Sequence, residues 1–400
     1  MRRFAAEYRD FFRLPDVLTL VAVSLLSRMP IGMVGLSMLV CLRESMGSYA
    51  LAGSVSGIYF VAMAVGAPIQ GRLIDRRGPG LVLAVTGIAS PLALAGILLS
   101  ARGGLGYAPV AAFAALAGLF ATPITVLTRT LWRRRFTRDE DRRRAFSVDA
   151  VMIEVNFTLG PAIVAGVIAW AGATAAFALA NAVVVASFLV FVLSPALGYF
   201  KPEPPAERHL LGPLTDPHLL LVFGATFGLT MSFGQLEVGY PAYATFLAMP
   251  ALAGVLLATN SFGSALGGAL FGGLHLKAPI ERQFAGALAL MALPLALHAF
   301  VDGPWAFAVA ALLAGATIAP SIACQSVLVS RLAPAKYATE AFTWSSTFIV
   351  SGLGAGMAVG GWLSESFGPK APFVAGSALV AAMSLVARRL PVRRAAAADH

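Results

Sequence analysis

The sequence predicts an all-α membrane protein of twelve transmembrane helices, arranged as two parallel six-helix halves. Three observations predict this fold: the composition is strongly apolar, the chain divides into stretches long enough to cross a bilayer, and the hydrophobic framework of the first half recurs in the second.

Composition places the chain in a bilayer. Of its 400 residues, 58% are hydrophobic and only 12% are charged, whereas a soluble domain has about 25% charged residues. A helix needs about 20 apolar residues to cross the hydrocarbon. The twelve segments that meet this length end at charge clusters or Gly/Pro breaks: 15–42, 49–70, 79–100, 107–131, 146–169, 174–197, 217–246, 250–274, 281–301, 304–330, 338–363 and 370–390.

Positive charge is concentrated on one predicted side of the membrane. If the N-terminus is cytoplasmic, only Arg43, Arg102 and Lys370 of the 29 Lys and Arg residues fall in loops on the opposite side. Arg28 and Arg129 lie within helices. Because cytoplasmic loops carry an excess of Lys and Arg, both termini are expected in the cytoplasm.

The net charge of +10 alone would suggest a nucleic-acid partner, but its placement favours a topological role. Arg133–Arg135 and Arg142–Arg144 share one predicted loop, and no repeated pattern of aromatic residues alternates with them for stacking on bases. We therefore expect contact with anionic lipid headgroups and no nucleic acid.

Small and apolar residues recur in the same order in the two halves of the chain. Helix 2 matches helix 8 at an offset of 201, and helices 4 and 5 match helices 10 and 11 at offsets of 197 and 196. Chance similarity between Ala- and Gly-rich helices is the alternative. The matched residues are Leu51–Gly53 with Leu252–Gly254, Gly66 with Gly267, Gly71 with Gly272, Leu116–Gly118 and Pro123 with Leu313–Gly315 and Pro320, and Ala145–Ser147 and Gly160 with Ala341–Thr343 and Gly356.

The repeat predicts the domain organisation. Residues 1–197 and 217–400 are expected to form six-helix halves, and the proline-containing segment 198–216 a cytoplasmic linker with an extended backbone. Six is an even number, so the two halves have the same orientation. Parallel halves that enclose a site near the bilayer midplane are a known plan of secondary transporters.

A charged, glycine-framed turn follows helix 2, with Gly71, Asp75, Arg76 and Gly78 at its characteristic positions. This pattern resembles the major facilitator superfamily (MFS), and the resemblance covers the whole chain. It implies the MFS fold and alternating access, in which this loop acts as a cytoplasmic gate. The sequence departs from the family pattern at Pro79 and Gly80, where basic residues are usual.

The residues of this motif have definite physical roles. We expect Gly71 to allow close helix approach, Gly78 to permit a tight turn, and Asp75 to pair with an arginine or a helix N-terminus of the other half when the cytoplasmic side closes. The alternative is that Asp75 and Arg76 only set topology. Leu276 stands at the corresponding place in the second half, so the gate is asymmetric.

Helix 5 contains Gly160-Pro161 followed by Gly166. This resembles the glycine–proline signature of exporters and antiporters within the family, in which the proline kinks the helix and the glycine packs tightly. Asn156 stands where a glycine is usual. The resemblance implies export.

Three ionisable residues are expected within the membrane: Arg28 on helix 1, Glu154 on helix 5 and Glu237 on helix 7. Such residues are costly in a bilayer and usually face a cavity or one another. We expect Arg28 and Glu154 to form a buried pair. In one interpretation, protonation of Glu154 couples the transporter to protons and frees Arg28 to bind an anionic substrate. In the other, the pair is a permanent salt bridge that fixes helix packing. Glu237 lies among Gly234, Gly239 and Pro241, which are expected to bend or break helix 7, and it is a candidate for binding a proton or cation, or for a structural hydrogen bond.

Polar residues near these three are candidates for the lining of an otherwise apolar cavity, although each could instead join helices: Asn156, Gln235, Asn260, Gln325 and Trp344. No spacing of histidines, nucleophiles or glycine loops predicts an enzyme, a metal site or a cofactor.

The sequence therefore predicts a proton-coupled exporter of a small organic or drug-like molecule. An uptake symporter and a lipid or amphiphile transporter of the same fold are alternatives. Arg far exceeds Lys and Ala is abundant, a composition typical of GC-rich bacteria. We expect a monomer in the bacterial inner membrane, with substrate, protons and lipids as partners.

Overall fold

The computed structural model describes residues 11–136, 138–200, 212–274, 276–334 and 338–391, which are helical apart from short connections. The first half of the chain contains α2 (Val17–Ser27), α3 (Pro30–Met46), α4 (Tyr49–Arg77), α5 (Pro79–Arg102), α6 (Tyr107–Leu119), α7 (Ile124–Arg135), α8 (Asp139–Leu193) and the 3₁₀ turn η1 (Pro195–Tyr199). The second contains η2 (Gly212–Thr215), α9 (Pro217–Phe246), α10 (Leu252–Gly273), α11 (Ile280–Phe300), α12 (Pro304–Gly315), α13 (Ile318–Leu332), α14 (Ala338–Phe367) and α15 (Ala371–Ala387).

The all-helical membrane fold is confirmed. Within the described residues, 10 segments are long and apolar enough to cross a membrane, and Ala371–Ala387 is a shorter apolar helix. The segment Val151–Leu193 joins two helices, because Gly172 inside it has φ 84 and turns the chain. Helical residues therefore occupy each of the twelve predicted spans.

Two details of the predicted spans are wrong. The first, fourth and tenth spans each consist of two helical pieces: α2 and α3, α6 and α7, and α12 and α13. Helix 5 was predicted to start at residue 146, but α8 starts at Asp139. The run Asp139-Glu140-Asp141 favours a helix start, because negative charge stabilises a helix N-terminus.

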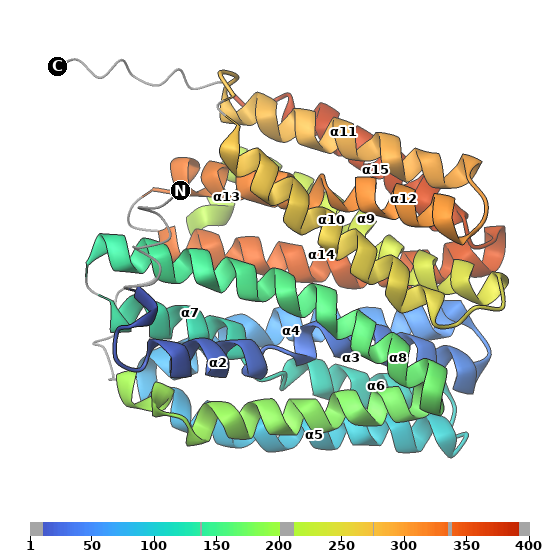
Figure 1. Cartoon of the computed structure of the whole chain (residues 1–400), viewed down its shortest axis with the longest axis horizontal. Helices are drawn as coiled ribbons and strands as arrows, with labels where there is room; N and C mark the ends of the chain where they lie inside the picture. The colour runs from blue at the N-terminus through green and yellow to red at the C-terminus, as the bar shows by residue number, and fades with distance from the viewer. Residues whose placement is uncertain (1–10, 137, 201–211, 275, 335–337, 392–400) are drawn as a thin grey trace.

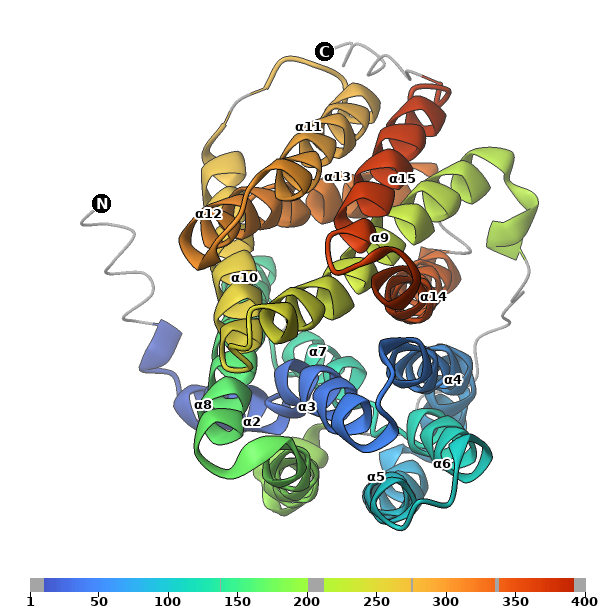
Figure 2. The ribbon, with the colours of Figure 1, turned by 90° about the vertical axis from the view of Figure 1, so that its right-hand side faces the viewer.

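Helices α2–α8 gather on one side of the bundle and α9–α15 on the other (Figures 1 and 2), with α4 beside α14 and α8 beside α10. We call the end that carries Arg72, Arg76, Arg77 and Arg133 the basic end, and the opposite end, where α4 begins, the far end.

The exact boundaries of the predicted halves stay a prediction, and residues 201–211 of the expected linker lie outside the described part.

Glycines matched by the repeat make equivalent contacts in the two halves. In each half, glycines on the second and fourth spans lie directly against backbone carbonyls, and a Cβ atom would overlap those oxygens. Small residues at helix interfaces allow such close approach in membranes. Equivalent contacts favour a true repeat over chance similarity. The pairs are Gly118 with Tyr59 and Gly66 with Leu119 in one half, and Gly315 with Asn260 and Gly267 with Ala316 in the other.

Gly118→Leu and Gly315→Leu should both destabilise the protein, because the added side chain would force α4 from α6, or α10 from α12. Overpacking of this kind costs about 1–3 kcal/mol or more. The readout is the apparent melting temperature in detergent, followed by size-exclusion chromatography. Gly71→Leu is the matched control, since a Cβ there has no neighbour within 4 Å; equal melting of all three variants would contradict the proposed contacts.

Candidate functional site

Glu154 and Glu237 are both half-buried and face the boundary between the two halves. Glu154 precedes Pro161 and Ala165 of α8 by seven and eleven residues and so shares their helix face. Pro161 and Ala165 contact Gly254 of α10, in the other half. Glu154 therefore points toward the side of α8 that meets α10.

Glu237 faces the first half from α9. Gly239, two residues further on, lies against the Phe373 ring of α15. Residues two apart on a helix lie on nearly opposite faces, since the helix turns about 100° per residue. Glu237 thus points away from α15, and Figure 2 shows α9 between α15 and α3, which it contacts.

The expected break of helix 7 around Glu237 is wrong, whereas a bend there stays a prediction. Helix α9 is continuous from Pro217 to Phe246, with Pro241 inside it. Gly234 and Gly239 serve packing instead: Gly234 lies against the Leu353 carbonyl of α14, where no Cβ would fit. These two glycines mark close neighbours and not irregular backbone.

Arg28 pairs with Asp149, so the expected pairing of Arg28 with Glu154 is wrong in its partner. The Arg28 Nη1 atom lies 2.6 Å from Asp149 Oδ1, and the two side chains are 0% and 3% exposed. Arg28 also donates to the Thr128 hydroxyl, and Trp132 Nε1 donates to Asp149 Oδ1 at 3.1 Å. The compensated charge pair leaves Glu154 on a different face of α8.

Sequence analysis did not single out Asp149, which stands close to the predicted start of helix 5. The predicted helix began three residues before it, whereas α8 begins at Asp139. The added turns carry Asp149 into the bundle. Its spacing was an available signal: Asp149, Asn156 and Gly160 recur at intervals of seven and four, which place them on one face, and Gly160 contacts Gly32 of α3.

Four of the five cavity candidates are buried in helix packing. Asn156 donates to the Leu25 carbonyl at 3.3 Å, Asn260 to the Ala311 carbonyl at 3.0 Å, and Gln325 to the Ser345 hydroxyl at 2.7 Å. Gln235 is only 2% exposed, and Trp344 is half-buried. The three bonded amides therefore join helices, which was the alternative to a cavity-lining role.

The glycine-framed turn has the geometry of a tight connection. Only Gly78, with φ 77, separates α4 from α5, and Arg76 is exposed. The close approach expected at Gly71 is absent, because a Cβ there would meet no atom within 4 Å among the described residues. The side chain of Asp75 lies outside the described part of the structure.

Helix α8 continues through Gly160 and Pro161 without a break. Gly160 lies against Gly32 of α3, where neither residue has room for a Cβ, and the Pro161 carbonyl faces Gly254. This part of α8 consequently contacts its own half on one face and the other half on another.

The two halves meet closely at the far end. Gly53 and Gly57 of α4 lie against the backbone of α14, at Gly361 and Gly354. Glu365 of α14 accepts hydrogen bonds from the Ser48 hydroxyl at 2.5 Å and the Ala50 amide at 2.9 Å. It therefore caps the N-terminus of α4 from the opposite half, where a negative charge is favourable.

A second cluster fixes the basic end of the first half. Asp16 binds Arg135, with Nε 3.1 Å and Nη2 3.0 Å from Oδ1, and it accepts a hydrogen bond from the Tyr199 hydroxyl. That bond to a carboxylate raises the pKa of Tyr199. The start of α2 is thereby tied to the end of α7 and to η1.

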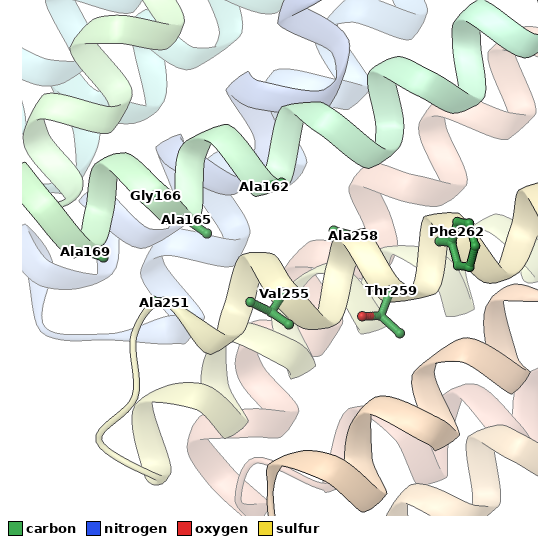
Figure 3. A pocket seen from close by; sticks show the side chains of 9 residues that line it. All are labelled: Ala162, Ala165, Gly166, Ala169, Ala251, Val255, Ala258, Thr259 and Phe262. Atoms are coloured by element: carbon green, nitrogen blue, oxygen red, sulfur yellow. The ribbon is translucent and has the colours of Figure 1, made fainter.

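An apolar groove of about 490 Å³ lies between α8 and α10 (Figure 3). It adjoins a second apolar hollow of about 660 Å³ that extends toward Trp305 at the far end. Among the described residues that line the first groove, Thr259 alone has a polar side chain. The groove is lined by Ala162, Ala165, Gly166, Ala169, Ala251, Val255, Ala258, Thr259 and Phe262.

Comparison with known proteins identifies the family. The model of the Major Facilitator Superfamily matches residues 20–286, more than half of the chain. The chain belongs to the major facilitator superfamily. It is therefore a multi-pass membrane protein and an MFS-type secondary transporter, not an enzyme.

Individual relatives are distant. The uncharacterized MFS-type transporter y4rN of Sinorhizobium fredii (strain NBRC 101917 / NGR234) is 25% identical over 172 residues, which span 43% of this MFS chain and only 42% of that protein. Among solved structures, the nucleoside transporter NupG has a TM-score of 0.75 at 13% identity, covering 93% of this chain and 99% of its own. A POT family transporter in complex with a thioalcohol conjugated peptide has a TM-score of 0.72 at 12% identity, covering 92% and 94%. These structures confirm the MFS fold.

Glu365→Gln should weaken far-end closure, because the neutral amide loses the charge that caps α4. We expect the ratio of closed to open molecules to fall about two- to five-fold, which corresponds to a loss of 0.3–1 kcal/mol. The measurement is the electron–electron distance distribution between spin labels at Leu105→Cys and Trp305→Cys, which lie at the far end of the two halves. Glu44→Gln removes an exposed carboxylate at the same end and should leave the distribution unchanged; equal effects of both variants would contradict the cap.

Proposed function

We propose that this transporter exports a small organic molecule in exchange for protons. The observation that carries the proposal is the placement of Glu154 and Glu237, two half-buried carboxylates at membrane depth that face the opposite half. A carboxylate in this position is favourable only with a proton, a cation or water beside it. Its protonation can therefore depend on which side of the bundle is open.

The orientation of the proposed cycle follows from charge. We place the basic end in the cytoplasm of a bacterial inner membrane, because Lys and Arg accumulate on the cytoplasmic side. The far end then faces outward and is closed in this conformation. The glycine–proline pair of α8 supports export, since it resembles the exporter signature.

The class of solute is supported by the surroundings of the two glutamates. The ion pair of Arg28 is satisfied by Asp149 and so offers no free cation for a polyanion. The solved structures of similar fold include a nucleoside transporter and a POT family transporter with a peptide conjugate. A moderately polar or amphipathic organic solute is the class we propose.

Proton release by the purified protein tests the coupling role. When the detergent-solubilised transporter is challenged with a library of organic compounds, a ligand of an antiporter should displace protons from the coupling carboxylate. We expect this release in the wild type and its loss in Glu154→Gln or Glu237→Gln, measured with a pH dye in weak buffer. Asp302→Asn, an exposed carboxylate at the far end, is the control. Ligand binding without proton release in the wild type would contradict antiport.

Transport of an amphiphile is a second candidate, favoured by the apolar groove between α8 and α10. Gly166 lines this groove and has room for a side chain. Gly166→Phe should fill it and lower the amount of co-purified phospholipid about two-fold or more, measured by mass spectrometry. Gly224→Phe, at an exposed and uncrowded glycine of α9, is the control. Unchanged lipid content in Gly166→Phe would remove the support for this candidate.

A further inference from the structure

The first membrane helix is interrupted between α2, which ends at Ser27, and α3, which begins at Pro30, and we call this interruption the kink. Arg28, Met29, Ile31 and Gly32 all donate their amides three residues back, at 3.0–3.3 Å, in place of the usual four. Pro30 has no amide hydrogen to donate. A 3₁₀ turn within a membrane helix often marks a hinge.

Side chains of α8 stabilise this kink. Asn156 donates to the Leu25 carbonyl at 3.3 Å, and Ser187 to the Leu26 carbonyl at 3.1 Å. Arg28 stands in the kink itself, and its guanidinium is held by Asp149 of α8 and Thr128 of α7. The kink is therefore tied to both neighbouring helices by polar groups that are buried.

The internal repeat shows that the fold does not require a charge at this place. In the internal repeat, Thr128 corresponds to Gln325 at an offset of 197, and Asp149 corresponds to Ser345 at an offset of 196. Those two side chains are hydrogen-bonded at 2.7 Å in the second half. The same helix junction thus exists as a neutral pair in one half and as part of an ion pair in the other.

The Arg28–Asp149 ion pair occurs in the half whose first membrane helix is kinked. Gly32 and Gly234 make equivalent contacts, with Gly160 and Gly356, and the residues four positions before them are Arg28 and Thr230. Thr230 lies within α9, which is continuous. The ion pair is consequently associated with the kink and not with packing of the half as a whole.

The kink sets the direction of α3 relative to α2. The start of α2 is fixed at the basic end by Asp16, Arg135 and Tyr199. Beyond the kink, α3 packs on α8 and contacts α9 of the other half. The angle at Arg28 therefore decides whether α3 reaches the opposing half correctly.

We infer that Asp149 is a positioning residue for alternating access: by holding Arg28 in the kink, it orients α3 for far-end closure against the second half. The inference concerns the conformational cycle of the transporter and is independent of which ion is coupled. Asp149 acts through Arg28 and need not contact the transported solute.

The experiment uses two pairs of spin labels in a background of Cys41→Ala and Cys324→Ala, whose thiols are buried and free. Labels at Leu18→Cys on α2 and Glu44→Cys on α3 report the kink, and labels at Leu105→Cys and Trp305→Cys report far-end closure. Asp149→Asn should broaden the kink distribution about two-fold and reduce the far-end closed population about two-fold or more. Asp149→Glu should restore both toward the wild type.

The double variant Arg28→Thr with Asp149→Ser keeps the test decisive if the single variant fails to fold. It installs the corresponding residues of the second half and leaves no buried charge at this junction, so it should fold with near-wild-type melting and still show the broad kink. Narrow distance distributions like those of the wild type in the double variant would overturn the inference. Failure of the double variant to fold would also overturn it, because the ion pair would then be needed for folding. Asp141→Asn, which removes the partner of Arg144 on the same helix at 3.3 Å, is the matched control and should change neither distribution.

Discussion

Close backbone contact at glycine is the interaction on which this structure depends. Lipid tails are as apolar as the side chains they replace, so the hydrophobic effect gives little reason for two helical halves to adhere within a bilayer. Van der Waals contact over bare backbone supplies that reason where Gly53 and Gly57 of α4 meet α14. Because such contacts involve no deep interlocking of side chains, they suit an interface that must open and close. The carboxylate of Glu365 adds an electrostatic contact at the same end.

Charges inside the bundle divide into two kinds that suit different roles. Arg28 and Asp149 are buried together, and each compensates the other. Removal of one partner would leave a costly buried charge, so the pair is suited to fixing geometry. Glu154 and Glu237 are only half-buried and face the boundary between the halves. Groups in that position experience the largest change in surroundings when the halves move, which is what coupling to a transport cycle requires.

The differences between the two halves carry more information than their similarity. The shared glycines build the same junctions twice, whereas the chemically distinctive residues occur once. Glu154 corresponds to Val350 through the offset of helix 5, Asp149 to Ser345, and the gate residue Asp75 to Leu276. Two similar halves that carry only one copy of each ionisable group can enclose a single binding site. That site can then be exposed to one side of the membrane and afterwards to the other. The first membrane helix also differs between the halves: it is interrupted between α2 and α3 in one half and continuous as α9 in the other.

Hydropathy, positive-charge placement and the glycine repeat determined the membrane class, the helical spans and the family resemblance from the sequence alone, because these properties depend on local composition and on short regular spacings. The turn at Gly78 was predictable for the same reason. The partner of Arg28 was not, since which carboxylate of helix 5 meets Arg28 depends on how α8 packs beside α2 and α3, and Asp149 stood only three residues after the predicted helix start. Nor could the sequence distinguish glycines that break a helix from those that admit a neighbour, as Gly234 and Gly239 do. Only the tertiary structure decided these points, because they depend on which helices lie side by side and how closely they approach.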